Sequence, residues 1–268
     1  MKSPCFTLIL FHVWVSSTPP LLSFSFDLTY TDICAWQNKL ACHGHIYLGE
    51  HQGWYAVSDE AFYPESQICA TKQQSGSSSE TVYTSIETGQ RVEWTTETNY
   101  KFRLSAFQQP LLDWLENNRE VIQPSNMYDH VLAEVRSGLQ DLSISRLRSR
   151  LSWGIPVPGD PQHTMYVWMD ALVNYMTALG YPDMQPGWPA DVHIVGKDIV
   201  RFHAIYWPAF LMAAGLPLPR TIVAHSHWTV NKAKMSKSKG NAINPFQALH
   251  TYGVDTMRYY LMRIGGHI

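Results

Sequence analysis

The sequence has few cysteines and little charge of either sign. Its 268 residues include four cysteines, with no C-x-x-C pair among them. This scarcity argues against a dense disulfide scaffold and a zinc knuckle, so reduced structural thiols and no zinc are expected. Charged residues make up 16% of the chain and the net charge is -2. No global basic field therefore recruits nucleic acid, and any binding of an anion must come from a local cluster of cations.

The first thirty residues lack arginine and lack an apolar run long enough to cross a bilayer. A mitochondrial presequence is typically arginine-rich, so this absence argues against one. The run from Phe6 to Val15, which follows Lys2, resembles the apolar core of a secretory signal, but it is too short to span a membrane. A secreted protein is thus one open alternative, and no membrane partner is expected.

The period of the apolar residues predicts the elements of the first half of the chain. With 45% hydrophobic residues, the chain can bury a substantial core. Short apolar and aromatic runs predict strands at 46–48, 54–57, 83–86 and 91–94, the last two forming a hairpin around Thr88-Gly89. Helical spacing then predicts two helices, the second capped by Ser125. Their core stripes are Leu104, Phe107, Leu111 and Leu115, followed by Met127, Val131, Leu132 and Val135.

Beyond a proline-rich break at 156–161, strands alternate with helices, which is typical of a largely parallel sheet. The predicted strands are 165–168, 192–195 and 221–224, and the predicted helices are 170–179 and 199–214. Asn244 before Pro245 is the expected N-cap of a later helix. The fold class is therefore α/β, with three strand–helix steps that amount to half of a doubly wound domain.

A lysine-rich loop lies near the end of the chain, at Lys234-Met235-Ser236-Lys237-Ser238. Lysines at 232, 234, 237 and 239 stand among small and hydroxyl residues. Such a cationic loop suits the binding of a polyphosphate. A short lysine cluster is also typical of a solvated loop or a targeting patch, so that alternative stays open for the loop taken alone.

Polar and aromatic residues follow each of the three predicted strands. They are Trp168, Asp170, Ala171 and Tyr175, then Gly196, Lys197, Asp198 and His203, then His225, Ser226, His227 and Trp228. Ligands of open α/β sheets bind beyond the carboxyl ends of the strands, so we expect these groups to share one crevice. Taken singly, Trp168, Tyr175 and His203 could each be a core residue.

Four ordered segments resemble methionyl-tRNA synthetases, which are class I aminoacyl-tRNA synthetases. The segments are 153–158, 166–175, 196–209 and 225–230 with the lysine loop, and weaker matches extend the resemblance over residues 44 to 260. The lack of zinc-binding cysteines and the run 173–177 resemble the mitochondrial branch. The resemblance implies the second half of a class I Rossmann-like parallel sheet with an inserted α+β connective domain.

The resemblance also implies a reaction: ATP-dependent activation of methionine and its transfer to tRNA(Met), in protein biosynthesis in the mitochondrial matrix. The implied catalytic residues are Lys234 and Lys237, whose ammonium groups reach the ATP phosphates together with Mg²⁺. ATP would be bound by Gly196, Asp198, His225, Met235 and Lys237. Methionine would be bound by Trp168, Ala171, Tyr175, Ile199 and His203, an aromatic pocket that suits a thioether. The implied partners are methionine, ATP and tRNA(Met), and no oligomeric state is implied.

The sequence lacks the His-Ile-Gly-His motif of class I synthetases, and His43-Gly44-His45 is read as a coincidence. The expected divisions are a non-family segment at 1–30, the connective domain at 31–150, the C-terminal half of the catalytic domain at 151–243 and the start of a helical region at 244–268. We therefore expect these residues alone to show little or no methionine-dependent ATP–pyrophosphate exchange, and to have an exposed sheet edge with poor solubility. A non-catalytic truncated isoform that acts as a binding module is the alternative.

Overall fold

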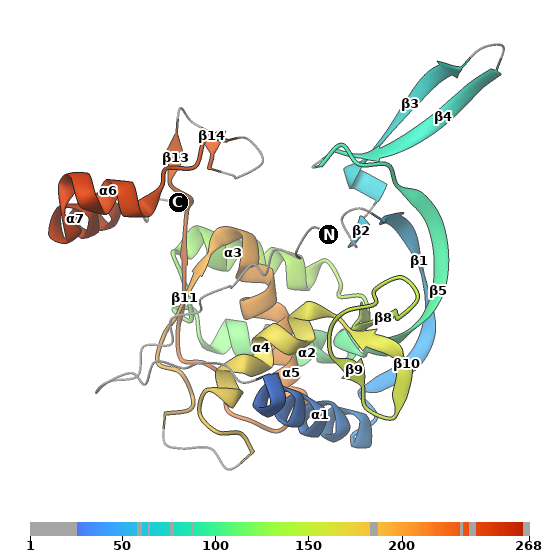
Figure 1. Cartoon of the computed structure of the whole chain (residues 1–268). Coiled ribbons are helices and arrows are strands. Elements are labelled where there is room, and N and C mark those ends of the chain that lie inside the picture. The colour runs from blue at the N-terminus through green and yellow to red at the C-terminus, as the bar shows by residue number, and fades with distance from the viewer. Residues whose placement is uncertain are drawn as a thin grey trace. The chain divides into compact units, whose positions relative to one another are not determined.

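Figure 1 shows the computed structural model of the chain. The structure describes residues 26–57, 61–63, 65–75, 78–86, 88–182, 187–230, 233–235 and 240–264. The two predicted catalytic residues are described only in part. Lys237 lies outside the described residues, and only the backbone of Lys234 is described. The other two lysines of the loop, Lys232 and Lys239, also lie outside them.

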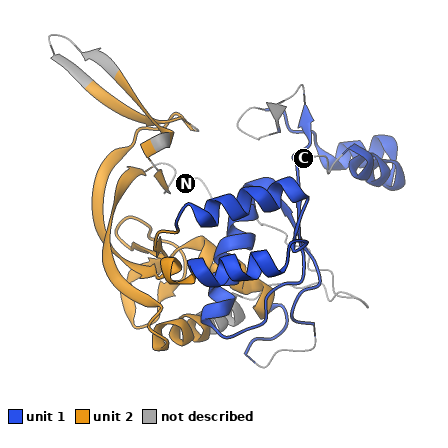
Figure 2. Cartoon of the chain, turned by 180° about the vertical axis from the view of Figure 1, so that it is seen from behind, with its two compact units in different colours: residues 1–24, 108–138, 178–268 blue, residues 25–107, 139–177 orange. Residues whose placement is uncertain are grey.

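The chain packs into two compact units, coloured in Figure 2. Unit 1 takes in Gln108–Gly138 and the described part of Ala178–Ile268, and unit 2 takes in Ser25–Phe107 and Leu139–Thr177. The domain boundaries expected from the sequence stay a prediction, because they follow the family pattern whereas the two units are defined by packing.

A three-stranded parallel sheet forms the centre of unit 1. Its order is β11 (His193–Gly196), β12 (Ile222–His225) and β6 (Ile122–Gln123). Two predicted strands are thus confirmed. The third place is taken by β6, which precedes helix α3, as β11 precedes the helical segment of 197–213.

The strand predicted at 165–168 is wrong. Helix α4 (Val167–Thr177) already begins there, and the strand before it, β10 (Asp160–Met165), pairs antiparallel with β9 (Pro156–Val157) in unit 2. The physical reason is the turn between them, where Gly159 has a φ of +77° that permits a tight reversal. The expected crevice of three parallel strand tips is corrected accordingly, since α4 does not follow a strand of the parallel sheet.

The helices of unit 1 begin with α2 (Gln108–Asn117) and α3 (Ser125–Arg136). Ser125 is wrong as an N-cap: Pro124 occupies that position without a side-chain bond, and its carbonyl accepts from Met127 and Tyr128. The helix predicted at 199–214 is confirmed as a 3₁₀ turn (Lys197–Ile199), a π-helical segment (Phe202–Tyr206) and α5 (Trp207–Ala213).

The last elements of unit 1 are β13 (Thr229–Val230), β14 (Ala233–Lys234), α6 (Pro245–Tyr252) and α7 (Val254–Ile264). The predicted cap of α6 is confirmed, because Oδ1 of Asn244 accepts from the backbone N–H of Phe246 at 2.9 Å and of Gln247 at 3.3 Å. This side chain satisfies donors that a helix start leaves unpaired.

Unit 2 contains an antiparallel sheet in the order β2 (Ala61–Tyr63), β1 (Ile46–Ala56), β5 (Glu93–Phe102) and β7 (Leu142–Ser143). The two strands predicted at 46–48 and 54–57 are one strand. The predicted turn at Gly89 is present, with a φ of +72° and a bond from Val92 N–H to Tyr83 O of 2.9 Å. The two strands that flank this turn do not pair with each other over their length. Instead, β4 (Ser78–Ser85) pairs with β3 (Ile68–Ser75), and β5 pairs with β1.

The remaining elements of unit 2 are α1 (Phe26–Cys42), two 3₁₀ turns (Glu65–Gln67 and Leu104–Phe107), and β8 (Ser145–Leu147), which pairs with β10. Helix α1 packs against α4, and its Trp36 and Leu40 are fully buried. The first predicted core stripe is confirmed, since all four of its members are buried. No helix within the described residues has the length and apolarity to cross a membrane.

Candidate functional site

The carboxyl ends of β11 and β12 lie side by side in unit 1. The two strands run in parallel with Gly196 opposite His225, and each of these residues is the last of its strand. The segments that follow therefore leave the same edge of the sheet. This is the edge at which open α/β sheets bind ligands.

Gly196 lies close to two imidazole rings at this edge. A Cβ atom added there would lie 3.9 Å from Cε1 of His225 and 4.0 Å from Nε2 of His227, which is ordinary van der Waals contact. The two rings thus lie beside a backbone that carries no side chain. A ligand can approach such a backbone closely. The structure in this way brings together two predicted ATP ligands, Gly196 and His225.

Asp198 and His227 form an ion pair across the same edge, with 3.0 Å between Oδ2 and Nε2. They occur two positions beyond the paired residues Gly196 and His225, so the parallel register brings them together. Their side chains are 45% and 24% exposed respectively. The sequence analysis expects both residues in one crevice but gives a ligand role to Asp198 alone, and the parallel register is the signal that could have indicated the contact between them.

The segment after β12 is held by His225 and Trp228. Nδ1 of His225 lies 2.9 Å from the carbonyl oxygen of Ser226. A carbonyl only accepts, so Nδ1 carries the proton of this bond. The rings of His225 and Trp228 are 5.2 Å apart, and the indole N–H of Trp228 donates to the carbonyl of Leu261 in α7 at 3.2 Å.

The lysine loop begins next to this segment. The hairpin of β13 and β14 places the backbone of Lys234 opposite Thr229, the residue after Trp228. The next residue, Met235, is half-buried. Of the predicted ATP-binding residues, Gly196, Asp198, His225 and Met235 are therefore described, all of them in unit 1.

His203 lies on the helix that follows β11 and is fully buried. Its Nδ1 donates to the carbonyl of Ile199 at 2.8 Å, which joins two predicted methionine-binding residues. Burial lowers the pKa of His203 to about 4, so its ring is neutral at physiological pH. It occurs in the π-helical segment, where the N–H of Trp207 donates to the carbonyl of Phe202. Such wide turns are frequent at functional sites.

The other three predicted methionine-binding residues lie on α4 of unit 2. Trp168 and Ala171 are half-buried, and Tyr175 is buried. Burial raises the pKa of Tyr175 above its ordinary value, so its hydroxyl stays protonated, and burial also raises the pKa of the neighbouring Asp170 to about 6. The five predicted methionine-binding residues are thus divided: Ile199 and His203 belong to unit 1, and the three residues of α4 belong to unit 2.

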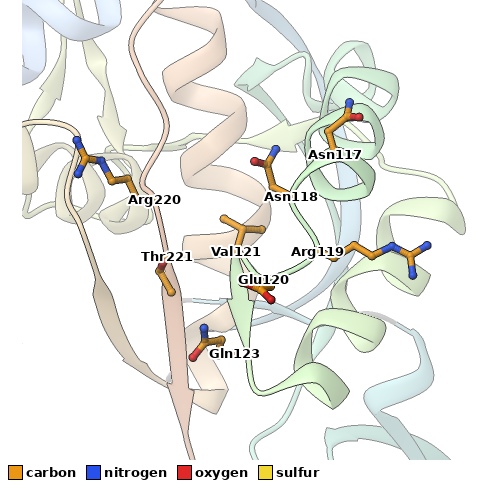
Figure 3. Close-up of a pocket in the computed structure, with 8 residues that line it drawn as sticks. All are labelled: Asn117, Asn118, Arg119, Glu120, Val121, Gln123, Arg220 and Thr221. Carbon is orange, nitrogen blue, oxygen red and sulfur yellow. The ribbon is translucent and has the colours of Figure 1, made fainter.

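A polar hollow of about 400 Å³ lies elsewhere in unit 1 (Figure 3). It is lined by Asn117, Asn118, Arg119, Glu120, Val121, Gln123, Arg220 and Thr221. These residues surround the amino-terminal ends of β6 and β12, and Figure 3 shows the two arginine side chains pointing away from one another. The hollow contains none of the predicted site residues and lies at the opposite end of the strands, so we assign it no ligand.

A parallel sheet with a glycine and two histidines at its carboxyl edge, followed by a lysine loop, is typical of the nucleotide-binding half of a class I synthetase. The profile of the family described as "tRNA synthetases class I (M)" matches residues 33–267. The chain belongs to this family. The α/β fold class and the family predicted from the sequence are confirmed.

Similar proteins narrow the comparison further. The chain is 54% identical over 233 residues to a probable mitochondrial methionine–tRNA ligase of Schizosaccharomyces pombe, covering 83% of this chain and 42% of the relative. For the mitochondrial methionine–tRNA ligase of Homo sapiens the identity is 51% over 228 residues, covering 84% of this chain and 38% of the relative. The structure of Mycobacterium tuberculosis methionyl-tRNA synthetase bound by methionyl-adenylate matches with a TM-score of 0.77 and 42% identity, over 88% of this chain and 45% of that one. The chain spans less than half the length of these relatives.

Proposed function

We propose that the chain carries part of the active site of a methionine–tRNA ligase, which activates methionine with ATP and transfers it to tRNA(Met) in the mitochondrial matrix. The observation that carries the proposal is the carboxyl edge of β11 and β12, where Gly196 and His225 pair and Asp198 follows directly. The names of the relatives support the amino acid, the tRNA and the mitochondrion. The methionyl-adenylate in the similar solved structure supports the use of ATP.

Each group has a role in this reaction. The carboxylate oxygen of methionine attacks the α-phosphorus of MgATP, and the bond to the pyrophosphate oxygen breaks. Negative charge moves onto the leaving pyrophosphate, so the ammonium groups of Lys234 and Lys237 would stabilise the transition state. Asp198 would accept hydrogen bonds from the nucleoside, and within unit 2 the aromatic rings of Trp168 and Tyr175 would suit contact with a thioether.

The test is calorimetric titration of the 268-residue chain with MgATP and with L-methionine, with D-methionine as the control. We expect saturable binding of MgATP and L-methionine, and weaker binding of the D-enantiomer because its side chain and carboxylate cannot both be placed. No binding of either substrate would contradict the proposal.

Pyrophosphate exchange in the same preparation tests whether these residues alone activate methionine. Binding with little or no exchange is the expected result for these residues alone, given the missing histidine motif. Exchange at the rate of a full-length relative would contradict that expectation and would exclude the non-catalytic alternative.

A further inference from the structure

His227 has no role in the proposed function, yet the register of the sheet places it beside Asp198. Gly196 and His225 pair at the ends of their strands. Asp198 and His227, each two positions beyond, therefore lie side by side, with 3.0 Å between Oδ2 and Nε2. A carboxylate oxygen only accepts, so Nε2 of His227 carries the proton of this bond. The contact thus has one direction, from imidazole to carboxylate.

Stability does not explain this contact. The Asp198 side chain is 45% exposed and that of His227 is 24% exposed. An ion pair this open to water contributes little to the free energy of folding, because solvent screens it and both side chains must be ordered. What the bond does change is the orientation of the carboxylate, since a donor on Oδ2 restricts rotation about the last side-chain bond.

The orientation matters because of what lies next to it. The same Nε2 atom of His227 is 4.0 Å from the position of a Cβ on Gly196, so the ring lies beside the Gly196 backbone as well as contacting Asp198. A ligand that approaches this backbone therefore comes close to an oriented carboxylate. Two adjacent hydroxyl donors, as on a ribose, match a carboxylate held in this way.

We propose that His227 is a positioning residue of the nucleotide site, which holds the Asp198 carboxylate in the plane that accepts from the ribose hydroxyls of a nucleoside. This inference rests on the proposed function, which supplies the nucleotide. His227 acts through Asp198 and takes no part in bond breaking.

Two substitutions of His227 separate its hydrogen bond from its ring. His227→Phe keeps an aromatic ring but removes the donor, whereas His227→Gln places an amide N–H at about the position of Nε2. The matched control is His130→Phe, at an exposed histidine of α3 in the same unit. The probes are adenosine and 2′-deoxyadenosine, titrated into the 268-residue chain by calorimetry.

We expect His227→Phe to weaken adenosine binding about tenfold, as the loss of one oriented hydrogen bond to a charged group does. The loss for 2′-deoxyadenosine should be smaller, so that discrimination between the two nucleosides shrinks. His227→Gln should restore most of the adenosine affinity, and His130→Phe should leave it unchanged. The melting temperature of all three variants should stay within about 3 °C of that of the unaltered chain.

Three outcomes would overturn the inference. Equal adenosine affinity for His227→Phe and the unaltered chain would remove His227 from the site while leaving the proposed function intact. Equal weakening by Phe and Gln, for both nucleosides, would show that a donor at this position does not restore binding, so that the hydrogen bond to Asp198 is not what His227 contributes. No adenosine binding by the unaltered chain would count against the proposed function itself, and this inference would fall with it.

Discussion

Two charged contacts, Asp198–His227 in unit 1 and Glu97–Arg150 in unit 2, lie in different environments. In unit 1, Asp198 and His227 meet at an open sheet edge with 45% and 24% of their side chains exposed. In unit 2, the Glu97 side chain is 1% exposed, lies 3.3 Å from Nε of Arg150 and accepts from Asn99 at 2.5 Å. An exposed pair can exchange its partner for a ligand at little cost, whereas a buried pair has no water to replace a lost partner.

The buried cluster of unit 2 also includes Arg146, which is 5% exposed. Its Nη1 donates to Ser143 Oγ at 2.9 Å and to the carbonyl of Ser145 at 2.7 Å. Its guanidinium lies over the rings of Phe62 at 4.9 Å and Tyr166 at 5.0 Å. Burial lowers the pKa of Arg146, and the charge of Glu97 opposes this shift. Glu97 is therefore the anion that favours the charge of the buried Arg146 and pairs with the half-buried Arg150.

Removing the charge of Glu97 should have the largest effect on stability. Glu97→Gln leaves Arg146 and Arg150 without their anion, and breaking a buried ion pair typically costs about 3–5 kcal/mol. We expect a fall of that size in the free energy of unfolding of unit 2, measured by urea denaturation. The control is Glu93→Gln at the exposed start of the same strand, which should change stability by about 0.5 kcal/mol or less. Equal losses of stability for Glu97→Gln and Glu93→Gln would contradict the contrast between buried and exposed charges.

Acidification should destabilise unit 1 through His203. Its folded pKa is about 4, against 6.5 for an ordinary histidine, because burial disfavours the charged ring. The unfolded chain therefore binds the proton first, and stability falls as the pH drops from about 6.5 to about 4. Between pH 7.5 and pH 5 we expect a loss of about 2 kcal/mol from this residue. Its neighbour His193, with a pKa lowered to about 3, adds a loss of the same sign.

The measurement is the difference in pH dependence between the unaltered chain and His203→Gln, which should be flatter over this range. His130→Gln, at an exposed position, should keep the original slope. Parallel curves for the unaltered chain and His203→Gln would show that the ring is not buried in its neutral form.

Asp170 of unit 2 should respond to pH with the opposite sign and a smaller size. Burial raises its folded pKa to about 6 from 3.8, so the folded state binds the proton first on acidification. The penalty of the buried charge is complete above pH 6 and disappears as the pH falls, which stabilises unit 2 by about 1 kcal/mol between pH 7.5 and pH 5. Asp170→Asn should lose this gain in thermal melts at the two pH values. His51, whose pKa is lowered to about 4, has the opposite slope, so only the difference from the unaltered chain is informative.

The sequence predicted those parts of the fold that depend on local periodicity. The apolar stripe of Leu104, Phe107, Leu111 and Leu115 is buried as expected, because helical spacing decides it. The Asn244 cap was predictable from two adjacent residues. By contrast, β6 has only two residues, too few to show any period, and it becomes a strand through pairing with β12 a hundred residues later. The hairpin of β9 and β10 was missed because its proline-rich turn was interpreted as a break between domains.

The candidate site likewise has parts that local patterns predicted and parts that depend on pairing between distant segments. Gly196, Asp198, His203 and His225 were predicted because motif residues follow strands directly. His227 was expected in the crevice, but its contact with Asp198 was not, because that contact follows from strand register, which no local pattern encodes. Glu97 was missed as a buried charge: it lies on the face of β5 opposite the exposed Thr96 and Thr98, where a carboxylate is not expected, and its partner Arg150 lies more than fifty positions away.

The smallest effect on stability should come from Asp198→Asn, although this change removes a predicted ATP ligand. The side chain is 45% exposed, so the loss of its ion pair with His227 should change the free energy of unfolding by about 0.5 kcal/mol or less in urea. The same substitution should weaken nucleoside binding at least as much as His227→Phe does, because it replaces the acceptor itself. A large loss of stability would mean that the open edge of unit 1 is structural like the cluster around Glu97, and the contrast between the units would fail. A small loss of stability with a large loss of affinity would show that the open charges serve binding, while the buried charges serve the fold.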